Sequence, residues 1–345
     1  MRSLTIAGKT ITQEGPAYTV AEAGNNHQGD YRKAILLFKS AAYAGFDAVK
    51  LQKRDVKTLY TQEMYNSEYN SEAAFGPTYG LHREALELGQ EAYTLLQESA
   101  RQLNLTMFAT AFDIPSAELL YRLGMPAYKI ASGDLKNLPL LRHIAKFGKP
   151  MIVSTGGACL DDVKRMYDCV MPLNSQLAIL QCTAAYPAGA DVLHLRVIET
   201  YLKHFDVIIG LADHHARTDR APAAYALGAR IFEKHVTLDR TWKGTDHAFS
   251  LEPREQEEYV ESLKRVYLAM GSQDKAPLAI EEKPIYKMGK AVYAKRAIAA
   301  GEKIGGENTV IRSPVEGMVP WKMDKFSVAT RVFDEDEPLS SGGLE

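Results

Sequence analysis

The chain has 345 residues, of which 41 are basic and 43 acidic, so its formal net charge is only −2. This balance excludes a bulk positive field, and we expect no binding to nucleic acid or to an anionic membrane. Three cysteines are too few and too irregularly spaced for a disulfide framework, which makes the cytoplasm the expected location. Residues 1–30 lack the pattern of a secretory leader, and no apolar run approaches the roughly 20 residues that cross a bilayer.

A hairpin is predicted near the start of the chain, where residues 4–13 alternate apolar and polar side chains around Gly8-Lys9. A repeating pattern follows, in which a short apolar run leads through a loop into an amphipathic helical stretch such as residues 31–45. The apolar runs are residues 18–24, 47–52, 106–110, 128–132, 151–156, 178–182, 207–213 and 229–236. Eight such units over about 250 residues predict an α/β fold, the (β/α)8 or TIM barrel.

A doubly wound open sheet has the same alternation and remains the alternative fold. The first strand, however, is followed by AEAGNNHQGD, which lacks the Gly-x-Gly-x-x-Gly spacing of a dinucleotide-binding sheet. Polar residues also gather at or near the ends of the predicted strands: Glu22, Lys50, Gln52, Thr110, Lys129, Ser132, Ser154, Thr155, Asp213, His214, Glu233 and His235. In a barrel those ends meet at one mouth, so this pattern favours the barrel.

We predict a barrel domain over residues 1–271, a linker over 272–286 and a small β-rich domain over 287–345. The linker is charged and contains prolines, and a module of about 60 residues gains stability from docking. The connection over residues 54–81 carries four tyrosines and is too long for an ordinary turn. It reads either as a lid or partner-contacting loop or as an inert excursion.

His214 and His235 are predicted on neighbouring strands of the barrel mouth. Imidazoles with oxygen co-ligands suit a catalytic divalent metal that keeps open positions for water or substrate. A pair of hydrogen-bonded core histidines is the alternative. Asp213 and Asp246 are candidates either for metal ligands or for acceptors that orient a ligand imidazole.

Lys50 and Lys129 are charges on strands that should be buried, so each is expected to meet an anion. A Lys–Glu bridge, to Glu22 or Glu233, is the alternative to a bound anionic ligand. Residues 154–157, Ser-Thr-Gly-Gly, add hydroxyls and backbone donors of the kind that hold phosphate oxygens. Together these groups predict a ligand with phosphate and carboxylate groups.

Glu22 ends the first strand and is the candidate general base. A carboxylate beside a metal and two lysines stays ionised and can accept a proton from water. Glu233 and His235 alternate onto the same face of the last strand, where a buried structural Glu–His pair is the alternative to a functional role. Glu233 is therefore predicted either to support the site or to contact substrate.

The chain resembles the sialic acid synthases, which condense phosphoenolpyruvate with an N-acetylated amino-sugar aldehyde. The likeness rests on AEAGNNHQGD, DAVKLQKRD, FATAFD, AYKIASGD, PMIVSTGG, LQCTAAYP, IIGLADHH and FEKHVTLDRTWKGTDHAFSLEP, together with the small C-terminal domain. The segments FGPTYG, LQCTAAYP and LDRTWKGTDHAFSLEP most resemble the animal-type branch of the family, which makes the 9-phosphate product from a 6-phosphorylated sugar.

The resemblance implies that His214 and His235 hold Mn²⁺, with Mg²⁺ or Co²⁺ as alternatives, and that Glu22 activates the attacking water. It implies that phosphoenolpyruvate is held by Lys50, Thr110, Lys129, Ser132 and Ser154, and that the sugar is contacted by Gln52, Asp134, Tyr186 and Asp246. It also implies an antifreeze-like (SAF) C-terminal domain that covers the partner's active site in a homodimer and supplies an arginine, for which Arg312 is the candidate.

Four positions depart from the family pattern and bear on the sugar. Ala184 and Ala212 stand where polar residues are common, Met288 stands where some members offer an aromatic, and Arg312-Ser313-Pro314 is offset from an Arg-Pro-Gly signature. A synthase for legionaminic or pseudaminic acid from a diacetamido-dideoxy sugar is therefore an alternative. A Schiff-base aldolase using Lys129 or Lys50, and a non-catalytic carbohydrate-binding protein, are alternatives of another class.

Overall fold

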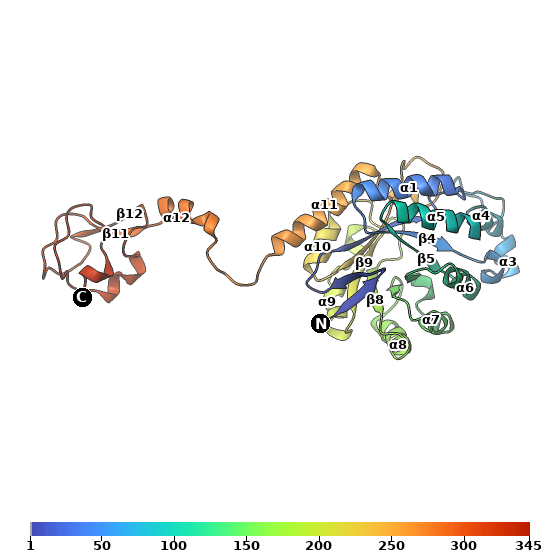
Figure 1. The fold of residues 1–345 in the computed structure, drawn as a ribbon, viewed down its shortest axis with the longest axis horizontal. Helices are drawn as coiled ribbons and strands as arrows, with labels where there is room; N and C mark the ends of the chain where they lie inside the picture. Colours follow the sequence, from blue (N-terminus) through green and yellow to red (C-terminus); the bar gives the residue numbers. More distant parts are fainter. Residues whose placement is uncertain (1) are drawn as a thin grey trace. The chain divides into compact units, whose positions relative to one another are not determined.

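The structure is a computed structural model that describes residues 2–345. The chain divides into two compact units, Met1–Gly271 and Ser272–Glu345, and Figure 1 shows the elements of each. Each unit has an apolar core of its own and is described separately below.

The first unit is built on a closed barrel of eight parallel strands. Their bounds are Tyr18–Gly24 (β3), Ala48–Lys53 (β4), Thr106–Ala111 (β5), Tyr128–Ile130 (β6), Met151–Ser154 (β7), Leu177–Cys182 (β8), Ile208–Asp213 (β9) and Ile231–His235 (β10). The last strand pairs with the first, so that His235 lies opposite Glu22. The predicted (β/α)8 barrel is thereby confirmed, and the open sheet is excluded.

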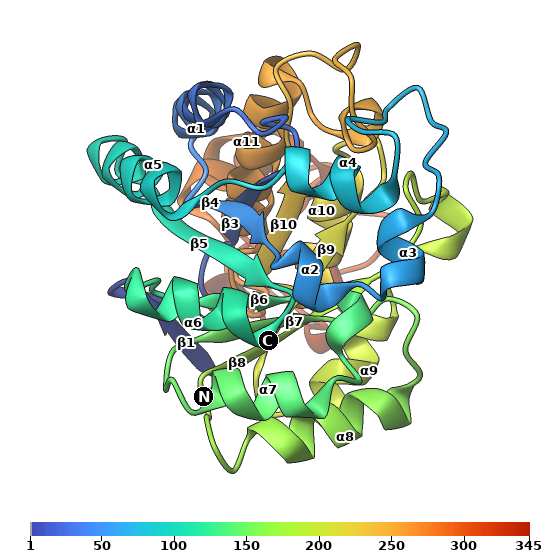
Figure 2. The same ribbon diagram turned by 90° about the vertical axis from the view of Figure 1, so that its right-hand side faces the viewer.

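Helices surround the strands, as Figure 2 shows. They are Tyr31–Ala44 (α1), Gln90–Gln102 (α5), Ile114–Arg122 (α6), Leu138–Ala145 (α7), Leu160–Val170 (α8), Val197–His204 (α9), Arg220–Ala226 (α10) and Pro253–Met270 (α11). Helix α1 begins after Asp30, whose side chain accepts from the Arg32 backbone NH, and it ends at Gly45, whose φ is 85°. None of the helices described here has the length and hydropathy needed to cross a membrane.

One end of the barrel is filled by apolar side chains. Strands β1 (Ser3–Ile6) and β2 (Lys9–Thr12) form an antiparallel hairpin, and its Leu4, Ile6 and Ile11 share a buried cluster with Tyr18 and Phe108 from the barrel. The polar residues of the strands lie at the opposite, carboxyl ends. This division is typical of the fold, since the filled end supplies stability and the other end is left for chemistry.

The connection between β4 and α5 folds over the carboxyl ends of the strands as three short helices, visible in Figure 2. They are Val56–Leu59 (α2), Gln62–Asn66 (α3) and Tyr79–Ala85 (α4). The ring of Tyr79 packs edge-on against Tyr60 and Tyr69, with centroids 5.1 and 5.5 Å apart, and Tyr69 also contacts His82. Aromatic packing therefore gives this long connection an ordered structure of its own.

The second unit contains a short antiparallel sheet, Ala291–Ala294 (β11) and Thr309–Arg312 (β12), packed on a small apolar core. The expected linker, residues 272–286, belongs to this unit and contains a 3-10 helix, Ala279–Glu281, and most of helix α12 (Glu282–Met288). The other 3-10 helices of the described chain are Ser132–Asp134, Ala190–Val192, His247–Phe249, Pro320–Lys325 and Ser341–Gly343.

Candidate active site

Two lysines and two glutamates meet inside the carboxyl end of the barrel. Lys50 on β4 lies with its Nζ 2.8 Å from Glu22 Oε2 on β3 and 3.7 Å from Glu233 Oε1 on β10. Lys129 Nζ on β6 lies 3.9 Å from Glu233 Oε2. All four side chains are buried. The structure thus shows the Lys–Glu bridges that the sequence left as an alternative, and the four charges cancel.

The two carboxylates differ in basicity. Burial raises the pKa of Glu22, although the charge of Lys50 partly opposes this. Burial alone would also raise the pKa of Glu233, but Lys129 and Lys50 together bring it below its ordinary value. Burial lowers the pKa of Lys129, against the effect of Glu233. Glu22 is therefore the stronger base of the pair, while Glu233 acts as the fixed counter-ion of both lysines.

Hydroxyl groups from two strands, β5 and β7, bond to the lysines. Lys50 Nζ donates to Thr110 Oγ1 at 2.7 Å, and Lys129 Nζ donates to Ser154 Oγ at 2.6 Å. Ser132 Oγ accepts from the Gly156 backbone NH at 2.9 Å. Thr110 and Ser154 therefore lie beside the two lysines, and Ser132 lies beside the loop that follows β7.

Thr155, also predicted at a strand end, does not join these hydroxyls. Its Oγ1 donates to the Leu180 carbonyl at 2.9 Å and accepts from the Tyr201 hydroxyl at 3.0 Å, so the side chain is held between the strands and α9. Nearby, a cavity of about 380 Å³ is lined by Thr155, Gln181 and Tyr201 among others, and none of the charged residues of the barrel mouth lines it.

His214 and His235 lie side by side, with ring centroids 5.5 Å apart. His214 Nδ1 lies 2.9 Å from the Thr183 carbonyl, to which it donates, so its Nε2 is left with a free lone pair. His235 Nδ1 is buried without a hydrogen-bond partner and lies 3.9 Å from Asp246 Oδ2. Unpartnered imidazole nitrogens of this kind fit a divalent metal.

A metal at this place would have two protein ligands. Among residues 2–345, no three side chains of His, Cys, Asp or Glu come close enough together to hold an ion. A site with two imidazoles keeps several coordination positions for substrate oxygens and water, which is typical of catalytic and not of structural metals. The burial of His235 lowers its pKa, which keeps the imidazole neutral and able to bind a cation.

Asp213 points away from the histidines and is excluded as a metal ligand. Its Oδ2 accepts from Lys234 Nζ at 2.8 Å, and its Oδ1 accepts from the His215 backbone NH at 2.8 Å. Lys234 alternates with Glu233 and His235 along β10, so it lies on the outer side of the barrel. The completely buried pair Asp213–Lys234 thereby holds the chain directly after His214.

Three of the predicted sugar contacts, Gln52, Tyr186 and Asp246, lie beside this cluster. Gln52 Nε2 donates to Glu22 Oε1 at 2.7 Å, and the ring of Tyr186 lies 4.2 Å from that of His214. Asp134, on the 3-10 helix after β6, accepts from Asn137. Arg312 lies in the second unit on β12, where it pairs with Asp336.

Two residues of the site were not predicted from the sequence. Cys182 Sγ lies 3.5 Å from Ser132 Oγ and 3.9 Å from His214 Nδ1. Arg54 directly follows β4, and its Nη2 donates to Gln52 Oε1 at 2.5 Å. The one available signal was Lys53-Arg54, two cations at the end of a strand whose other polar residues were already assigned to the mouth.

Comparisons with known proteins bear on this geometry. The NeuB family model matches residues 37–275. The N-acetylneuraminate-9-phosphate synthase of Mus musculus is 39% identical over 295 residues, which cover 85% of this chain and 82% of that protein. The N,N'-diacetyllegionaminic acid synthase of Campylobacter jejuni is 33% identical over 92% of this chain and 97% of its own.

A solved structure is similar to this chain as well. The N-acetylneuraminic acid synthetase of Leptospira borgpetersenii superposes with a TM-score of 0.71 at 31% identity, over 82% of this chain and 95% of its own. Because the family model spans most of the barrel and these relatives span most of the chain, the protein belongs to the NeuB family.

Proposed function

We propose that the protein condenses phosphoenolpyruvate with N-acetylmannosamine or its 6-phosphate, giving N-acetylneuraminate or its 9-phosphate and inorganic phosphate. The observation that carries this proposal is the meeting of Glu22, Lys50 and Lys129 with the His214–His235 pair at one end of the barrel. A general base, two cations for an anionic substrate and a metal-binding pair are the groups that such a condensation requires.

In this proposal His214 and His235 hold a divalent cation, for which Mn²⁺ is the first choice and Mg²⁺ or Co²⁺ are alternatives. When bound, the ion polarises the aldehyde of the sugar. The Lys–Glu cluster carries no net charge by itself, because two lysines face two glutamates. Asp246, 3.9 Å from His235 Nδ1, is placed to hold this imidazole or a sugar hydroxyl.

The lysines and hydroxyls bind phosphoenolpyruvate. Lys50 and Lys129 face its negative charges. Its oxygens accept hydrogen bonds from the hydroxyl groups of Thr110, Ser132 and Ser154. The π electrons of the C2–C3 bond of phosphoenolpyruvate form the new bond from C3 to the aldehyde carbon, whose oxygen takes up a proton as its π bond breaks, and water adds to C2. Glu22 accepts the proton of that water, and the new hydroxyl at C2 becomes the ketone as phosphate leaves with cleavage of its bond to C2. The raised pKa of Glu22 suits this task.

Two alternatives are kept because specific observations favour them. The 33% identity to a legionaminic acid synthase favours a diacetamido-dideoxy sugar as the second candidate substrate. The lowered pKa of buried Lys129 is also a property of Schiff-base lysines. Borohydride trapping with pyruvate tests for a Schiff-base aldolase. We expect no trapped adduct, because Lys129 Nζ already donates hydrogen bonds to Ser154 and to the Ile130 carbonyl.

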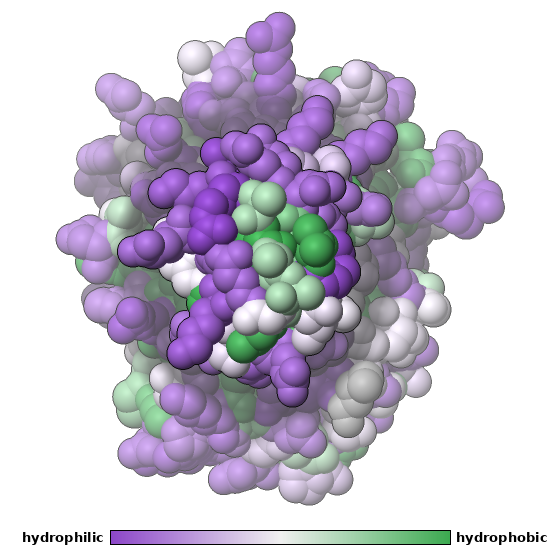
Figure 3. Space-filling view, turned by 90° about the vertical axis from the view of Figure 1, so that its left-hand side faces the viewer, coloured by the Kyte–Doolittle hydropathy of each residue, from purple (hydrophilic) through white to green (hydrophobic). Residues whose placement is uncertain are grey.

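We further propose that the second unit is an antifreeze-like (SAF) domain that covers the partner's site in a homodimer, with Arg312 reaching the sugar. Apolar side chains gather on the face of this unit that Figure 3 shows. Ile285, Met288 and Ile311 are exposed apolar residues of this unit, and exposed apolar side chains favour docking against another surface. Three free cysteines are in keeping with a reducing, cytoplasmic location.

One experiment tests the proposed function directly. The protein is incubated with phosphoenolpyruvate and Mn²⁺, and N-acetylmannosamine, its 6-phosphate and a diacetamido-dideoxy sugar are offered separately. We expect release of phosphate that depends on one of the first two sugars and stops when a chelator removes the metal. Release that is independent of every sugar, or that survives full chelation, would contradict the proposal.

A further inference from the structure

The two carboxylate oxygens of Glu22, the proposed general base, have different partners. Gln52 Nε2 donates to Oε1 at 2.7 Å, whereas Oε2 lies 2.8 Å from Lys50 Nζ. Within residues 2–345 no donor gives Oε2 a hydrogen bond of favourable geometry, so this buried oxygen keeps a free lone pair. Oε1 therefore anchors the carboxylate, and Oε2 is the oxygen left to accept a proton.

The backbone leaves room for the hydrogen bond between Gln52 and Glu22. The pairing of β3 with β4 shifts register between Glu22 and Gly24, and Gly24 has a φ of 49°. A Cβ at Gly24 would lie 3.2 Å from Glu22 Oε1 and 3.3 Å from Gln52 Nε2, so both groups would have to shift. A residue without a side chain at this bulge thus preserves the space that the hydrogen bond occupies.

The amide of Gln52 can point either of its two ends at Glu22, and only the NH2 end can donate to a carboxylate. Its orientation is set on the other side, where Arg54 Nη2 donates to Gln52 Oε1 at 2.5 Å. A guanidinium has donors and no acceptor, so it binds only the oxygen end of an amide. Asn25 Nδ2 lies 3.4 Å from the same oxygen, but its own amide can turn over. Arg54 therefore directs the NH2 end of Gln52 toward Glu22.

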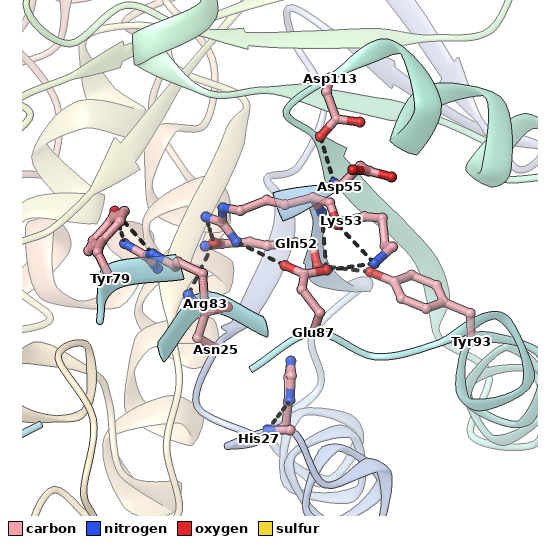
Figure 4. Close-up of polar contacts among 12 residues, drawn as sticks. Asn25, His27, Gln52, Lys53, Asp55, Tyr79, Arg83, Glu87, Tyr93 and Asp113 are labelled. Carbon is pink, nitrogen blue, oxygen red and sulfur yellow. Dashed lines mark hydrogen bonds and ion pairs between the residues drawn. The ribbon is translucent and has the colours of Figure 1, made fainter. Parts of the chain in front are cut away.

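Arg54 is itself held in place and is only 6% exposed. Its guanidinium stacks on Phe112 at 3.8 Å from the ring centroid, and its Nη1 lies 3.6 Å from Glu87 Oε1. The Arg54 backbone NH donates to Glu87 Oε2 at 3.1 Å. The Tyr93 hydroxyl fixes the neighbouring strand by donating to the Gln52 carbonyl at 2.9 Å, and Figure 4 shows these contacts around Gln52 and Glu87. The donor that binds Gln52 is therefore part of a rigid arrangement.

Pairing with Glu87 does not by itself account for Arg54. Glu87 already has a cation, because Lys53 Nζ lies 2.7 Å from its Oε2. Arg54 Nη1 is moreover buried without a hydrogen bond, and burying a guanidinium with an unused donor is destabilising. The short hydrogen bond from Nη2 to Gln52 is the contact that Lys53 does not duplicate. Arg54 is therefore distinguished from its neighbour by its contact with the amide that holds Glu22.

We propose that Arg54 is a positioning residue for the reaction. It fixes the amide of Gln52, Gln52 holds Oε1 of Glu22, and Oε2 is thereby presented as the oxygen that takes the proton of the attacking water. A base held in one orientation does not have to rotate before it accepts the proton, so the arrangement acts on turnover and not on the binding of phosphoenolpyruvate. This inference rests on the proposed function, in which Glu22 is the general base.

The test measures phosphate release by the wild type, Arg54→Met and Arg54→Lys with Mn²⁺ and the sugar that the wild type uses. Methionine keeps an apolar contact with Phe112 but has no donor. We therefore expect kcat to fall by about tenfold while KM for phosphoenolpyruvate stays within about twofold. Lysine, like arginine, can only donate, so Arg54→Lys should recover most of the lost kcat. Arg101→Met is the control: Arg101 is exposed on α5 and pairs with Glu98, so kcat stays unchanged.

A double variant separates positioning from a general loss of structure. Gln52→Met removes the amide on which Arg54 acts, so adding Arg54→Met should lower kcat no further, whereas independent losses would multiply. If urea unfolding shows that Arg54→Met does not fold, Arg54→Gln replaces it, because a glutamine can bind either end of the Gln52 amide and selects neither. Unchanged kcat in the variant without the donor, equal losses in Arg54→Met and Arg54→Lys, or multiplied losses in the double variant overturn the inference. If the wild type releases no phosphate with any sugar, the proposed function fails, and the inference with it.

Discussion

Glu22 accepts a hydrogen bond from Gln52 and an ion pair from Lys50, which leaves a buried carboxylate held in one orientation. If Glu22 is the general base, the Glu22→Gln side chain has the same shape and still lies beside Gln52, but it cannot accept a proton. We expect kcat to fall by about 10²- to 10⁴-fold while KM for phosphoenolpyruvate changes little, as steady-state kinetics would show. Glu261→Gln, an exposed pair partner on α11, is the control. Normal turnover by Glu22→Gln would show that Glu22 is not the general base.

The pH dependence of kcat/KM reports on the same carboxylate. Glu22 must be ionised to act, so activity is lost as pH falls through its pKa, and burial puts this acid limb above the range of an ordinary glutamate. Lys50 lowers this pKa, so Lys50→Met should move the limb to still higher pH. Lys129→Met should move it less, because Lys129 lies nearest to Glu233. A limb that stays in place, or moves to lower pH, in Lys50→Met contradicts this account.

At the scale of elements, the pair Asp213–Lys234 joins β9 to β10 and also holds the carbonyl of His215 in the loop that follows β9. Lys234→Met leaves Asp213 buried without its cation, which costs about 3–5 kcal/mol of the free energy of unfolding. Lys264→Met, which breaks an exposed pair with Glu261, should cost no more than about 1 kcal/mol. Urea unfolding measures both. Equal losses of unfolding free energy in the two variants would mean that the buried pair stabilises the fold no more than the exposed pair does.

The elements themselves were predictable where the pattern is local. The stripe of Ala34, Leu37, Phe38 and Ala41 is the buried face of α1, because helical periodicity brings these side chains to one side in any surroundings. The connection after β4 was expected to be long, and to be either a lid or partner-contacting loop or an inert excursion. Its three helices depend on contacts such as Tyr69 with His82, between residues thirteen positions apart, which no local pattern encodes.

At the scale of the molecule, the two apolar cores lie within separate units. A chain ending at Gly271 is therefore expected to keep the barrel, with a cooperative melt followed by circular dichroism within a few degrees of the full chain. If the second unit covers a partner's site, the same truncation should raise KM for the sugar more than that for phosphoenolpyruvate. A truncated chain that does not fold, although the full chain does, would show that the barrel needs the second unit.

The sequence by itself determined the alternation of strands and helices and the gathering of polar residues at one end of the strands. Both follow from side-chain periodicity, which is a local property of the backbone. The tertiary structure decided which charge meets which. Only closure of the barrel brings Glu233 on the last strand to Lys50 on the second, and only the folded connection brings Tyr69 to His82. Electrostatic energies depend on distances of a few ångströms between residues far apart in the chain, so the site's charge balance could be known only from the fold.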